Sequence, residues 1–283
     1  MTNVPSRATW LWLVEAALAE DIGPGDATSE ALLSRDAQGE ARLEARDAIV
    51  VAGLAIACEV FAQRGVTLSA RVEDGAAVAP GTELARVRGP AIAILEAERT
   101  ALNFVQRLSG IATLTRRYCE AVRGTRAEIV DTRKTTPGWR TLEKWAVRCG
   151  GGRNHRHALF DGILIKDNHV AAVGGAGIAV ARARERGSRH LRIRCEVESF
   201  EQAREALEAG ADSLLVDNQP PDVIAKVVAL CAGRVRVEAS GGVNLDSVAA
   251  IARTGVDEIS VGALTHSAPA ADVALEWTAR SPS

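Results

Sequence analysis

The feature that most limits how this chain can fold is a repeat in its second half. Short apolar runs end abruptly at a polar residue or a glycine, and a helical segment then follows. The runs cover residues 127–130, 162–165, 191–195, 213–216, 235–239 and 258–261. The last three end at Asp217, Ser240 and Gly262, which are 23 and 22 residues apart, the length of one strand, one helix and two loops. Such units predict parallel strands joined by right-handed crossovers.

Helix boundary signals agree with this repeat. Ser199 and Gln202 form a predicted capping box, and Gly210 is expected to end the helix that follows. Asn244 is expected to cap another helix, which ends at Gly255. Six strand–helix units are too few for a complete barrel of eight strands, so a smaller or incomplete α/β barrel is predicted. An open doubly wound sheet is the alternative.

The first part of the chain, up to about residue 112, has a mixed pattern. Helices are predicted at residues 11–19, 54–64 and 92–118, the last with a candidate break at Ser109-Gly110, and alternating strands at 41–46 and 48–52. Residues 71–87 contain Asp-Gly and Pro-Gly pairs and predict a strand–turn–strand. Similar hairpins occur in lipoyl and biotin carrier domains, but this segment has no lysine for attachment, which argues against a carrier.

Composition restricts the compartment and the partners. The chain has 34 Lys and Arg against 36 Asp and Glu, so no positive excess favours nucleic acid or an anionic membrane. No apolar run approaches the roughly 18 residues of a membrane span, and the first residues do not resemble a signal peptide. The five scattered cysteines include no C-x-x-C pair, which favours reduced thiols over a zinc site or a disulfide framework. We therefore expect a soluble cytoplasmic protein that binds neither nucleic acid nor membranes.

Positive charge is nevertheless concentrated in residues 131–169, which hold eight Lys or Arg against four acidic residues. Three of the eight have the spacing of one helix face and are expected to lie in solvent, namely Arg140, Lys144 and Arg148. Arg133, Lys134 and Lys166 instead lie where strands end, which is where α/β folds place functional groups. Arginine forks and lysine point charges both bind anions, so a ligand with several negative charges is predicted.

Small residues at the ends of the last two runs suggest where a phosphate binds. Residues 239–242 and 261–267 would let backbone N–H groups approach an anion closely, although ordinary tight turns have the same composition. Glu196 and Asp217 end two middle runs and would repel such an anion unless they bind sugar hydroxyls or a cation. Mg²⁺ held by these carboxylates and by substrate phosphates satisfies both conditions, and pairing with arginines is the structural alternative. His155 and His157 lack a nearby third ligand, so they are a weak zinc signal.

Several longer motifs stand in a fixed order along nearly the whole chain. They are Glu20-Asp21 with residues 25–29, residues 98–103, residues 108–113, D-T-R-K-T-T-P-G at 131–138, G-G-G-R-N-H-R at 150–156, L-I-K-D-N-H at 164–169, C-E-V-E at 195–198, V-D-N at 216–218 and S-G-G at 240–242. This set resembles the quinolinate phosphoribosyltransferases, the type II phosphoribosyltransferases of NAD biosynthesis.

The resemblance implies a fold, a reaction and an assembly. The fold is an incomplete TIM-like α/β barrel at residues 113–267 and an N-terminal α/β sandwich domain at residues 1–112. The C-terminal segment 268–283 is expected to join the sandwich domain. The reaction transfers phosphoribosyl from phosphoribosyl pyrophosphate to quinolinate and gives nicotinate mononucleotide, pyrophosphate and CO2. The implied assembly is a homodimer, or a higher oligomer, in which Arg99 enters the active site of the partner subunit.

The resemblance also implies roles for single residues. Arg133, His155 and Arg156 would hold the quinolinate carboxylates. Lys134 and Lys166 would lie between that ligand and the pyrophosphate. Glu196 and Asp217 would engage the ribose hydroxyls and Mg²⁺. The backbone around the remaining four positions would bind the 5′-phosphate, namely Ser240, Gly241, Gly242 and Gly262.

Three other functions remain open at this point. A molybdenum-transport-associated relative shares the barrel and the D-T-R-K-T motif, but is expected to lack the stretches at 154–156 and 164–169 that stand intact here. A Schiff-base aldolase would use Lys166, because this lysine ends a barrel strand. A non-catalytic phosphosugar-binding protein would bind the same ligand without releasing pyrophosphate.

Overall fold

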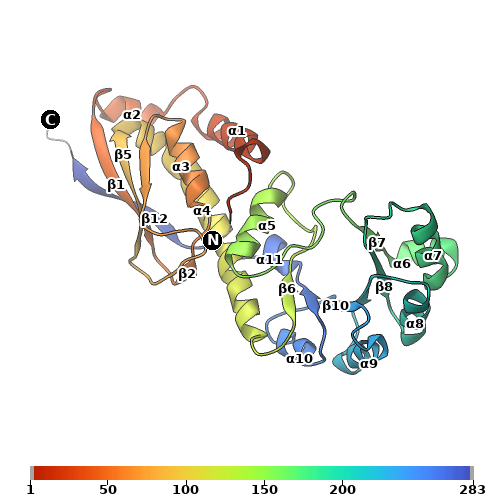
Figure 1. The fold of residues 1–283 in the computed structure, drawn as a ribbon. Helices are drawn as coiled ribbons and strands as arrows, with labels where there is room; N and C mark the ends of the chain where they lie inside the picture. Colours follow the sequence, from red (N-terminus) through yellow and green to blue (C-terminus); the bar gives the residue numbers. More distant parts are fainter. Residues whose placement is uncertain (1–2, 281–283) are drawn as a thin grey trace. The chain divides into compact units, whose positions relative to one another are not determined.

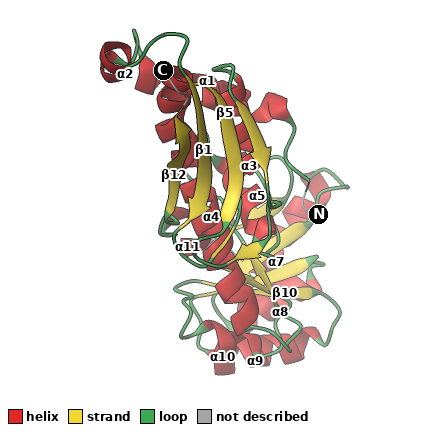
Figure 2. Ribbon diagram, turned by 90° about the vertical axis from the view of Figure 1, so that its left-hand side faces the viewer, coloured by secondary structure: helices red, strands yellow, loops and turns green. Residues whose placement is uncertain are grey.

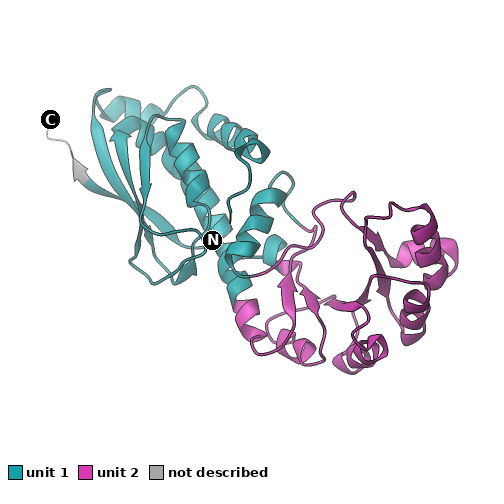
Figure 3. Cartoon of the chain, viewed as in Figure 1, with its two compact units in different colours: residues 1–116, 135–151, 264–283 teal, residues 117–134, 152–263 magenta. Residues whose placement is uncertain are grey.

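The computed structural model describes residues 3–280, which separate into two compact units (Figures 1 and 3). Unit 1 is made of residues 1–116, 135–151 and 264–283, and unit 2 of residues 117–134 and 152–263. By their contacts, residues 135–151 belong with unit 1, whereas the division predicted from the sequence assigned them to the barrel.

Unit 1 is built around an antiparallel sheet (Figure 2). Within the described residues the sheet has four strands, in the order β12 (Val273–Arg280), β1 (Gln38–Ala45), β5 (Glu83–Pro90) and β3 (Thr67–Ala70). The last strand of the chain therefore pairs with the first. Fully buried side chains such as Leu43, Leu84 and Val87 line the core side of the sheet. The remaining elements are η1 (Arg7–Thr9), α1 (Leu11–Ile22), α2 (Ala27–Leu32), β2 (Ile49–Val50), α3 (Leu54–Ala62), β4 (Ala77–Val78) and α5 (Arg140–Cys149).

The predicted strand–turn–strand at residues 71–87 is wrong in its pairing. β4 and β5 both form, but β4 pairs with β2 and not with β5. The reason is that both edges of β5 are occupied, one by β1 and the other by β3.

The predicted long helix forms without a break, as α4 (Ala91–Ala121). Position 110, inside this helix, is a glycine because the backbone of Pro269 and Ala270 packs directly against it. A Cβ at residue 110 would overlap the Pro269 carbonyl oxygen. This glycine therefore allows a close approach of two backbones and does not end the helix.

Unit 2 contains a parallel sheet that forms an open barrel (Figure 1). Within residues 117–263 its strands are β6 (Glu128–Val130), β7 (Ile163–Ile165), β8 (Ile193–Val197), β9 (Ser213–Asp217), β10 (Arg236–Ser240) and β11 (Glu258–Ser260). Their order is β6-β11-β10-β9-β8-β7. Each of the six predicted apolar runs therefore contains most of one strand.

This strand order decides between the two predicted architectures. From β7 to β11 each strand pairs with the next in sequence, without the reversal that a doubly wound sheet requires. β6 pairs with β11, the far end of the series, as in a closed barrel. The gap lies between β6 and β7, where Arg153 forms a parallel bridge to Val130 and covers the exposed edge of β6. The predicted incomplete α/β barrel with an N-terminal α/β sandwich is confirmed.

Helices connect the barrel strands. They are α6 (Asp167–Val173), α7 (Ala176–Arg186), α8 (Phe200–Glu208), α9 (Pro221–Cys231) and α10 (Val248–Ala252), and α11 (Ala263–His266) follows β11. Ser199 caps α8 as predicted, by accepting a hydrogen bond from the Gln202 N–H, while the Gln202 side chain accepts from Glu198 N. Asn244 stands at the start of a turn, and α10 begins four residues later.

Two further findings concern the described residues as a whole. Among residues 3–280, no helix combines the length and the hydrophobicity that a membrane span requires. The five cysteines all lie in this range, and no disulfide joins them.

Candidate active site

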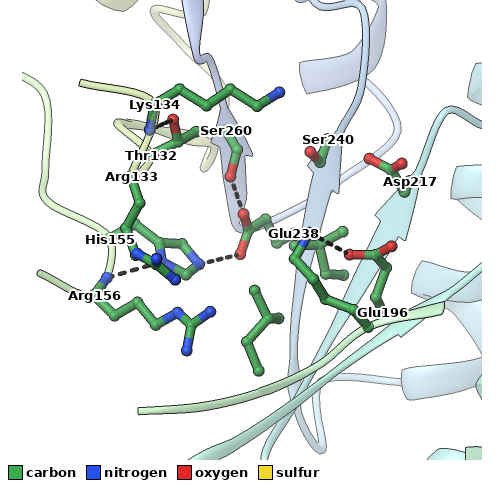
Figure 4. Close-up of a pocket in the computed structure, with 13 residues that line it drawn as sticks. Thr132, Arg133, Lys134, His155, Arg156, Glu196, Asp217, Glu238, Ser240 and Ser260 are labelled. Atoms are coloured by element: carbon green, nitrogen blue, oxygen red, sulfur yellow. Dashed lines mark hydrogen bonds and ion pairs between the residues drawn. The ribbon is translucent and has the colours of Figure 1, made fainter. Parts of the chain in front are cut away.

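The inward-facing side chains of the barrel form layers, because alternate residues of a strand point to the same side. At the carboxyl ends of the strands lie Lys166, Glu196, Asp217 and Ser240. One layer deeper, two residues earlier on three of these strands, lie Leu164, Leu215 and Glu238. Together with the segments after β6 and before β7, these two layers enclose a cavity of about 210 Å³ (Figure 4).

Most of the residues predicted to form the site line this single cavity. They are Arg133, Lys134, His155, Arg156, Lys166, Glu196, Asp217 and Ser240. Gly241 and Gly242 follow Ser240 directly, and Gly262 follows β11, but none of these three glycines is a lining residue. Arg99 lies on α4 in unit 1 and its side chain is exposed.

The cavity is divided by charge. Figure 4 shows Arg133, His155 and Arg156 on one side and the carboxylates of Glu196 and Asp217 on the other. Burial lowers the pKa of the Arg156 guanidinium, and the nearby charge of Arg133 lowers it further. Two like charges held together in a half-buried pocket favour binding of an anion, which would relieve their repulsion.

The side with the arginines is fixed by Asp131, which is fully buried at the end of β6. Its carboxylate accepts hydrogen bonds from the backbone N–H of His155 at 2.9 Å and from Nδ2 of Asn154 at 2.5 Å. Arg156 is held in turn by a hydrogen bond of 3.0 Å from Nη1 to the carbonyl of Gly162. The strand that leads to Arg133 and Lys134 thus also positions His155 and Arg156.

The opposite side combines a lysine with two carboxylates. Nζ of Lys166 lies 3.6 Å from Oε2 of Glu196. Burial raises the pKa of the Glu196 carboxyl, Lys166 opposes this shift, and the negative charges of Asp217 and Asp167 add to it. Cys195, the residue before Glu196, is no candidate nucleophile, because burial raises the pKa of its thiol to about 12.

The donor set of this side is compatible with Mg²⁺ only if a ligand completes it. Among the described residues, no three His, Cys, Asp or Glu side chains come together to hold a metal ion by themselves. The negative charge of Asp217 contributes to the raised pKa of Glu196, and a cation bound beside the two carboxylates would remove this repulsion. Two carboxylates completed by substrate phosphates and water are a usual Mg²⁺ site.

The loop after β10 owes its shape to one close contact. The N–H of Asn218 donates a hydrogen bond to the carbonyl of Ser240 at 2.9 Å, which brings the loop after β9 against Gly241. Gly241 has φ +91°, and a Cβ there would overlap Oδ1 of Asn218. A tight turn therefore explains this glycine, and the turn leaves Ser240 facing the cavity.

Five lining residues were not predicted, and Glu238 is the most informative of them. The others are Thr132, Leu164, Leu215 and Ser260. Strands buried in a parallel sheet are usually apolar throughout, whereas β10 has the sequence R-V-E-A-S, with a polar residue at every second position. That alternation could have revealed Glu238, because it marks a polar barrel interior below the strand ends.

Comparison with known proteins agrees with this geometry. The model of the quinolinate phosphoribosyl transferase C-terminal domain matches residues 111–276, and that of the N-terminal domain matches residues 26–109. The chain belongs to the quinolinate phosphoribosyl transferase family. All 13 residues that line the cavity fall inside the part matched by the C-terminal domain of this family.

Individual members of the family are similar over almost their whole length. A Bacillus subtilis (strain 168) protein named probable nicotinate-nucleotide pyrophosphorylase (carboxylating) is 44% identical, over 92% of this chain and 90% of its own. The nicotinate-nucleotide pyrophosphorylase (carboxylating) of Mycobacterium leprae is 43% identical, over 93% and 95%. The solved structure of the nicotinate-nucleotide pyrophosphorylase from Francisella tularensis superposes with a TM-score of 0.93 at 37% identity and covers 98% of both chains.

Proposed function

We propose that this chain is a quinolinate phosphoribosyltransferase, which joins quinolinate to phosphoribosyl pyrophosphate and releases pyrophosphate and CO2. The observation that carries the proposal is the division of one cavity into a half with two arginines and a half with two carboxylates and a lysine. The first half suits an acid with two adjacent carboxylates. The second suits a sugar phosphate together with a cation.

The arginine half supplies recognition of the acid. Arg133 and Arg156 offer planar forks that can each take a carboxylate in two hydrogen bonds. His155 stands beside them and adds a directional donor or acceptor. Held in this way, the pyridine nitrogen of quinolinate can be brought close to the anomeric carbon of the sugar, and fixing two reactants in this manner removes much of the entropic barrier.

The other half neutralises the sugar phosphate. Lys134 reaches across the top of the cavity (Figure 4). Lys166 also lines the cavity, and its Nζ lies 3.6 Å from Oε2 of Glu196. Glu196 and Asp217 would hold the ribose hydroxyls and Mg²⁺, and Ser240 with the two glycines after it would bind the 5′-phosphate. Bound Mg²⁺ would stabilise the negative charge of the departing pyrophosphate.

The bond changes need no further group. The lone pair of the pyridine nitrogen forms a bond to the anomeric carbon, while the bond from that carbon to pyrophosphate breaks and its electrons leave with pyrophosphate. The ring nitrogen is then cationic. The bond to the adjacent carboxylate breaks, CO2 leaves, and the electron pair that remains on the ring carbon, stabilised by the cationic nitrogen, takes up a proton. Preorganised charges in a half-buried site provide the main stabilisation.

The alternative functions are not favoured. Matches to both domains of quinolinate phosphoribosyl transferase cover most of the chain, which argues against the molybdenum-transport-associated relative. Lys166 lies 3.6 Å from the Glu196 carboxylate and its side chain is 52% exposed, whereas a Schiff-base lysine is typically desolvated in a hydrophobic pocket or placed beside another cation. A cytoplasmic location and a homodimer with shared sites stay part of the proposal.

A substrate comparison tests the proposal. The purified protein is given phosphoribosyl pyrophosphate and Mg²⁺ with quinolinate, nicotinate or nicotinamide in separate reactions, and pyrophosphate release is measured. Of the three acceptors, we expect only quinolinate to give pyrophosphate release, because two carboxylates are needed to engage both arginines. Equal or faster release with nicotinate would contradict the assignment, and binding without any release would favour a phosphosugar-binding protein.

A further inference from the structure

Glu238 is a buried carboxylate on the floor of the cavity that the proposed reaction does not use. It lies in the middle of β10, two residues before Ser240, and only 1% of its surface is exposed. Ser260, on the adjacent strand β11, and Arg194, on β8, which is not adjacent to β10, each donate a hydrogen bond to it. Its Oε2 also lies 3.4 Å from Nε2 of His155, which is the contact that reaches the cavity wall (Figure 4).

The other contacts of His155 define which ring nitrogen carries the proton. Nδ1 accepts a hydrogen bond from the backbone N–H of Arg156 at 2.8 Å, so in the neutral ring Nδ1 has no proton. The proton is therefore on Nε2, the nitrogen that faces Glu238. With the His155 backbone held by Asp131, the imidazole is restrained on three sides.

The distance to Glu238 leaves room for a second acceptor. At 3.4 Å the contact is longer than a usual N–H···O hydrogen bond of about 2.9 Å. The carboxylate thus orients the Nε2–H without fully engaging it. Arg194 balances the charge of Glu238, so an incoming carboxylate does not meet an unpaired negative group at this point.

A purely structural role would make Glu238 one member of the ion-pair network inside the barrel. Glu258 is such a member: it pairs with Arg194 at 2.8 Å, as Glu238 does. Glu258 is the register partner of Glu238 on the adjacent strand β11, and it does not line the cavity. The contact with His155 is what distinguishes Glu238 from Glu258.

We propose that Glu238 is a positioning residue for quinolinate, which fixes the orientation of the His155 ring and directs its Nε2–H donor to a substrate carboxylate. This inference rests on the proposed function, in which His155 helps to bind quinolinate. It predicts that Glu238 affects the binding of the acid and leaves the binding of the sugar phosphate almost unchanged.

Steady-state kinetics of three variants separate these roles. In E238A the KM for quinolinate is expected to rise roughly 10-fold, while the KM for phosphoribosyl pyrophosphate stays within about twofold. E238Q keeps an acceptor for the Nε2–H in the same place and should restore most of the loss. E258Q disturbs the same arginine without touching His155, and should leave both KM values unchanged. If E238A does not fold, E238D serves instead, because it keeps the charge near Arg194 but withdraws it from His155 by one methylene.

A spectroscopic readout reports the contact between His155 and Glu238 directly. The chain has five histidines, so in nitrogen-15 NMR spectra the signals missing from H155A identify His155. We expect the Nε2–H signal of His155 to shift in E238A and E238D, where the acceptor is removed or withdrawn, and to stay near its wild-type position in E238Q. An unchanged Nε2–H signal together with an unchanged KM for quinolinate in E238A and E238D overturns the inference.

A double mutant separates failure of this inference from failure of the proposed function. If Glu238 acts through His155, E238A adds nothing to the KM increase of H155A, since residues that act through one contact are not additive. Full additivity would contradict the inference. If H155A itself has a normal KM for quinolinate, the proposed role of His155 fails, and the positioning role falls with it. If H155A raises that KM and E238A does not, the inference alone is wrong.

Discussion

Nζ of Lys166 lies 3.6 Å from Oε2 of Glu196, and this pair connects the ends of two adjacent barrel strands. The lysine side chain is 52% exposed and the carboxylate 9%, so the two partners differ greatly in access to water. In the free protein the lysine partly offsets the desolvation of Glu196. On binding, the phosphates of the substrate would compete for the lysine and leave the carboxylate to a cation or to ribose.

The raised pKa of Glu196 predicts a stability difference that depends on pH. Because burial raises the pKa of the folded carboxyl, its contribution to stability is fully present at acid pH and is lost as pH rises through that raised value. E196Q should therefore melt at a higher temperature than the wild type at neutral pH, and the advantage should shrink as the pH falls. Its activity should drop about 10- to 100-fold. E198Q is the control, because Glu198 is exposed, and it should change neither the melting temperature nor the activity. Parallel curves of stability against pH for E196Q and the wild type would contradict the predicted role of the buried carboxyl.

Arg133 should be required for binding of the acid. Replacing it by alanine is expected to weaken quinolinate binding by roughly 2–5 kcal/mol, the usual cost of removing one partner of a buried, hydrogen-bonded charge pair. R153A is the matched control, because Arg153 belongs to the same region but pairs with Glu128 and does not line the cavity. Isothermal titration calorimetry measures both. Equal affinities of R133A and R153A for quinolinate would show that Arg133 does not bind the acid.

Mixing of inactive variants tests the shared site. If Arg99 acts in the site of the partner subunit, R99A subunits mixed with K134A subunits form hybrid dimers that contain one intact site. Such mixtures should regain part of the wild-type activity after subunit exchange. No recovery, with exchange verified by a size or mass label, would show that Arg99 and Lys134 do not act across subunits.

Chelation tests the metal. Removal of divalent cations should abolish pyrophosphate release, and Mg²⁺ should restore it. D217N should raise the concentration of Mg²⁺ that gives half of the maximal rate, because one of the two carboxylates can no longer carry charge. Full activity in excess chelator would exclude the proposed role of Mg²⁺.

Glu143 should stabilise unit 1 without taking part in the reaction. It is fully buried, and its carboxylate accepts hydrogen bonds from Arg107, at 2.8 Å, and from N and Oγ1 of Thr136. E143A should lower the free energy of unfolding by about 3–5 kcal/mol, because it leaves the arginine without its buried partner. The exposed pair of Glu120 with Arg123 is the comparison, and E120A should cost about 0–1 kcal/mol. Similar losses in denaturant titrations of both variants would contradict this difference.

The sequence predicts the barrel and most of the cavity because both depend on local patterns. Strand ends in a parallel α/β fold converge on one edge, so locating the ends of the apolar runs was enough to bring Arg133, Lys166, Glu196 and Asp217 together. The capping residue Ser199 was found for the same reason, since its partner lies three positions away.

What the sequence did not predict depends on contacts between distant segments. The pairing of β4 with β2 follows from the occupied edges of β5, which no pattern within residues 71–87 contains. Gly110 was a candidate helix break in the sequence, and only the structure shows that this glycine makes room for the backbone of Pro269. Glu238 was not predicted because the expectation covered only residues at strand ends; the polar alternation of β10 marks Glu238 locally, but its partners Arg194 and Ser260 come from other strands.

One measurement tests the central claim, that a single cavity both joins the acid to the sugar and removes one of its carboxylates. Quinolinate labelled with carbon-14 in the carboxylate beside the ring nitrogen is incubated with phosphoribosyl pyrophosphate, Mg²⁺ and the protein. We expect one labelled CO2 for each pyrophosphate released. Pyrophosphate release with the label retained in the nucleotide, or no release at all, would contradict the account.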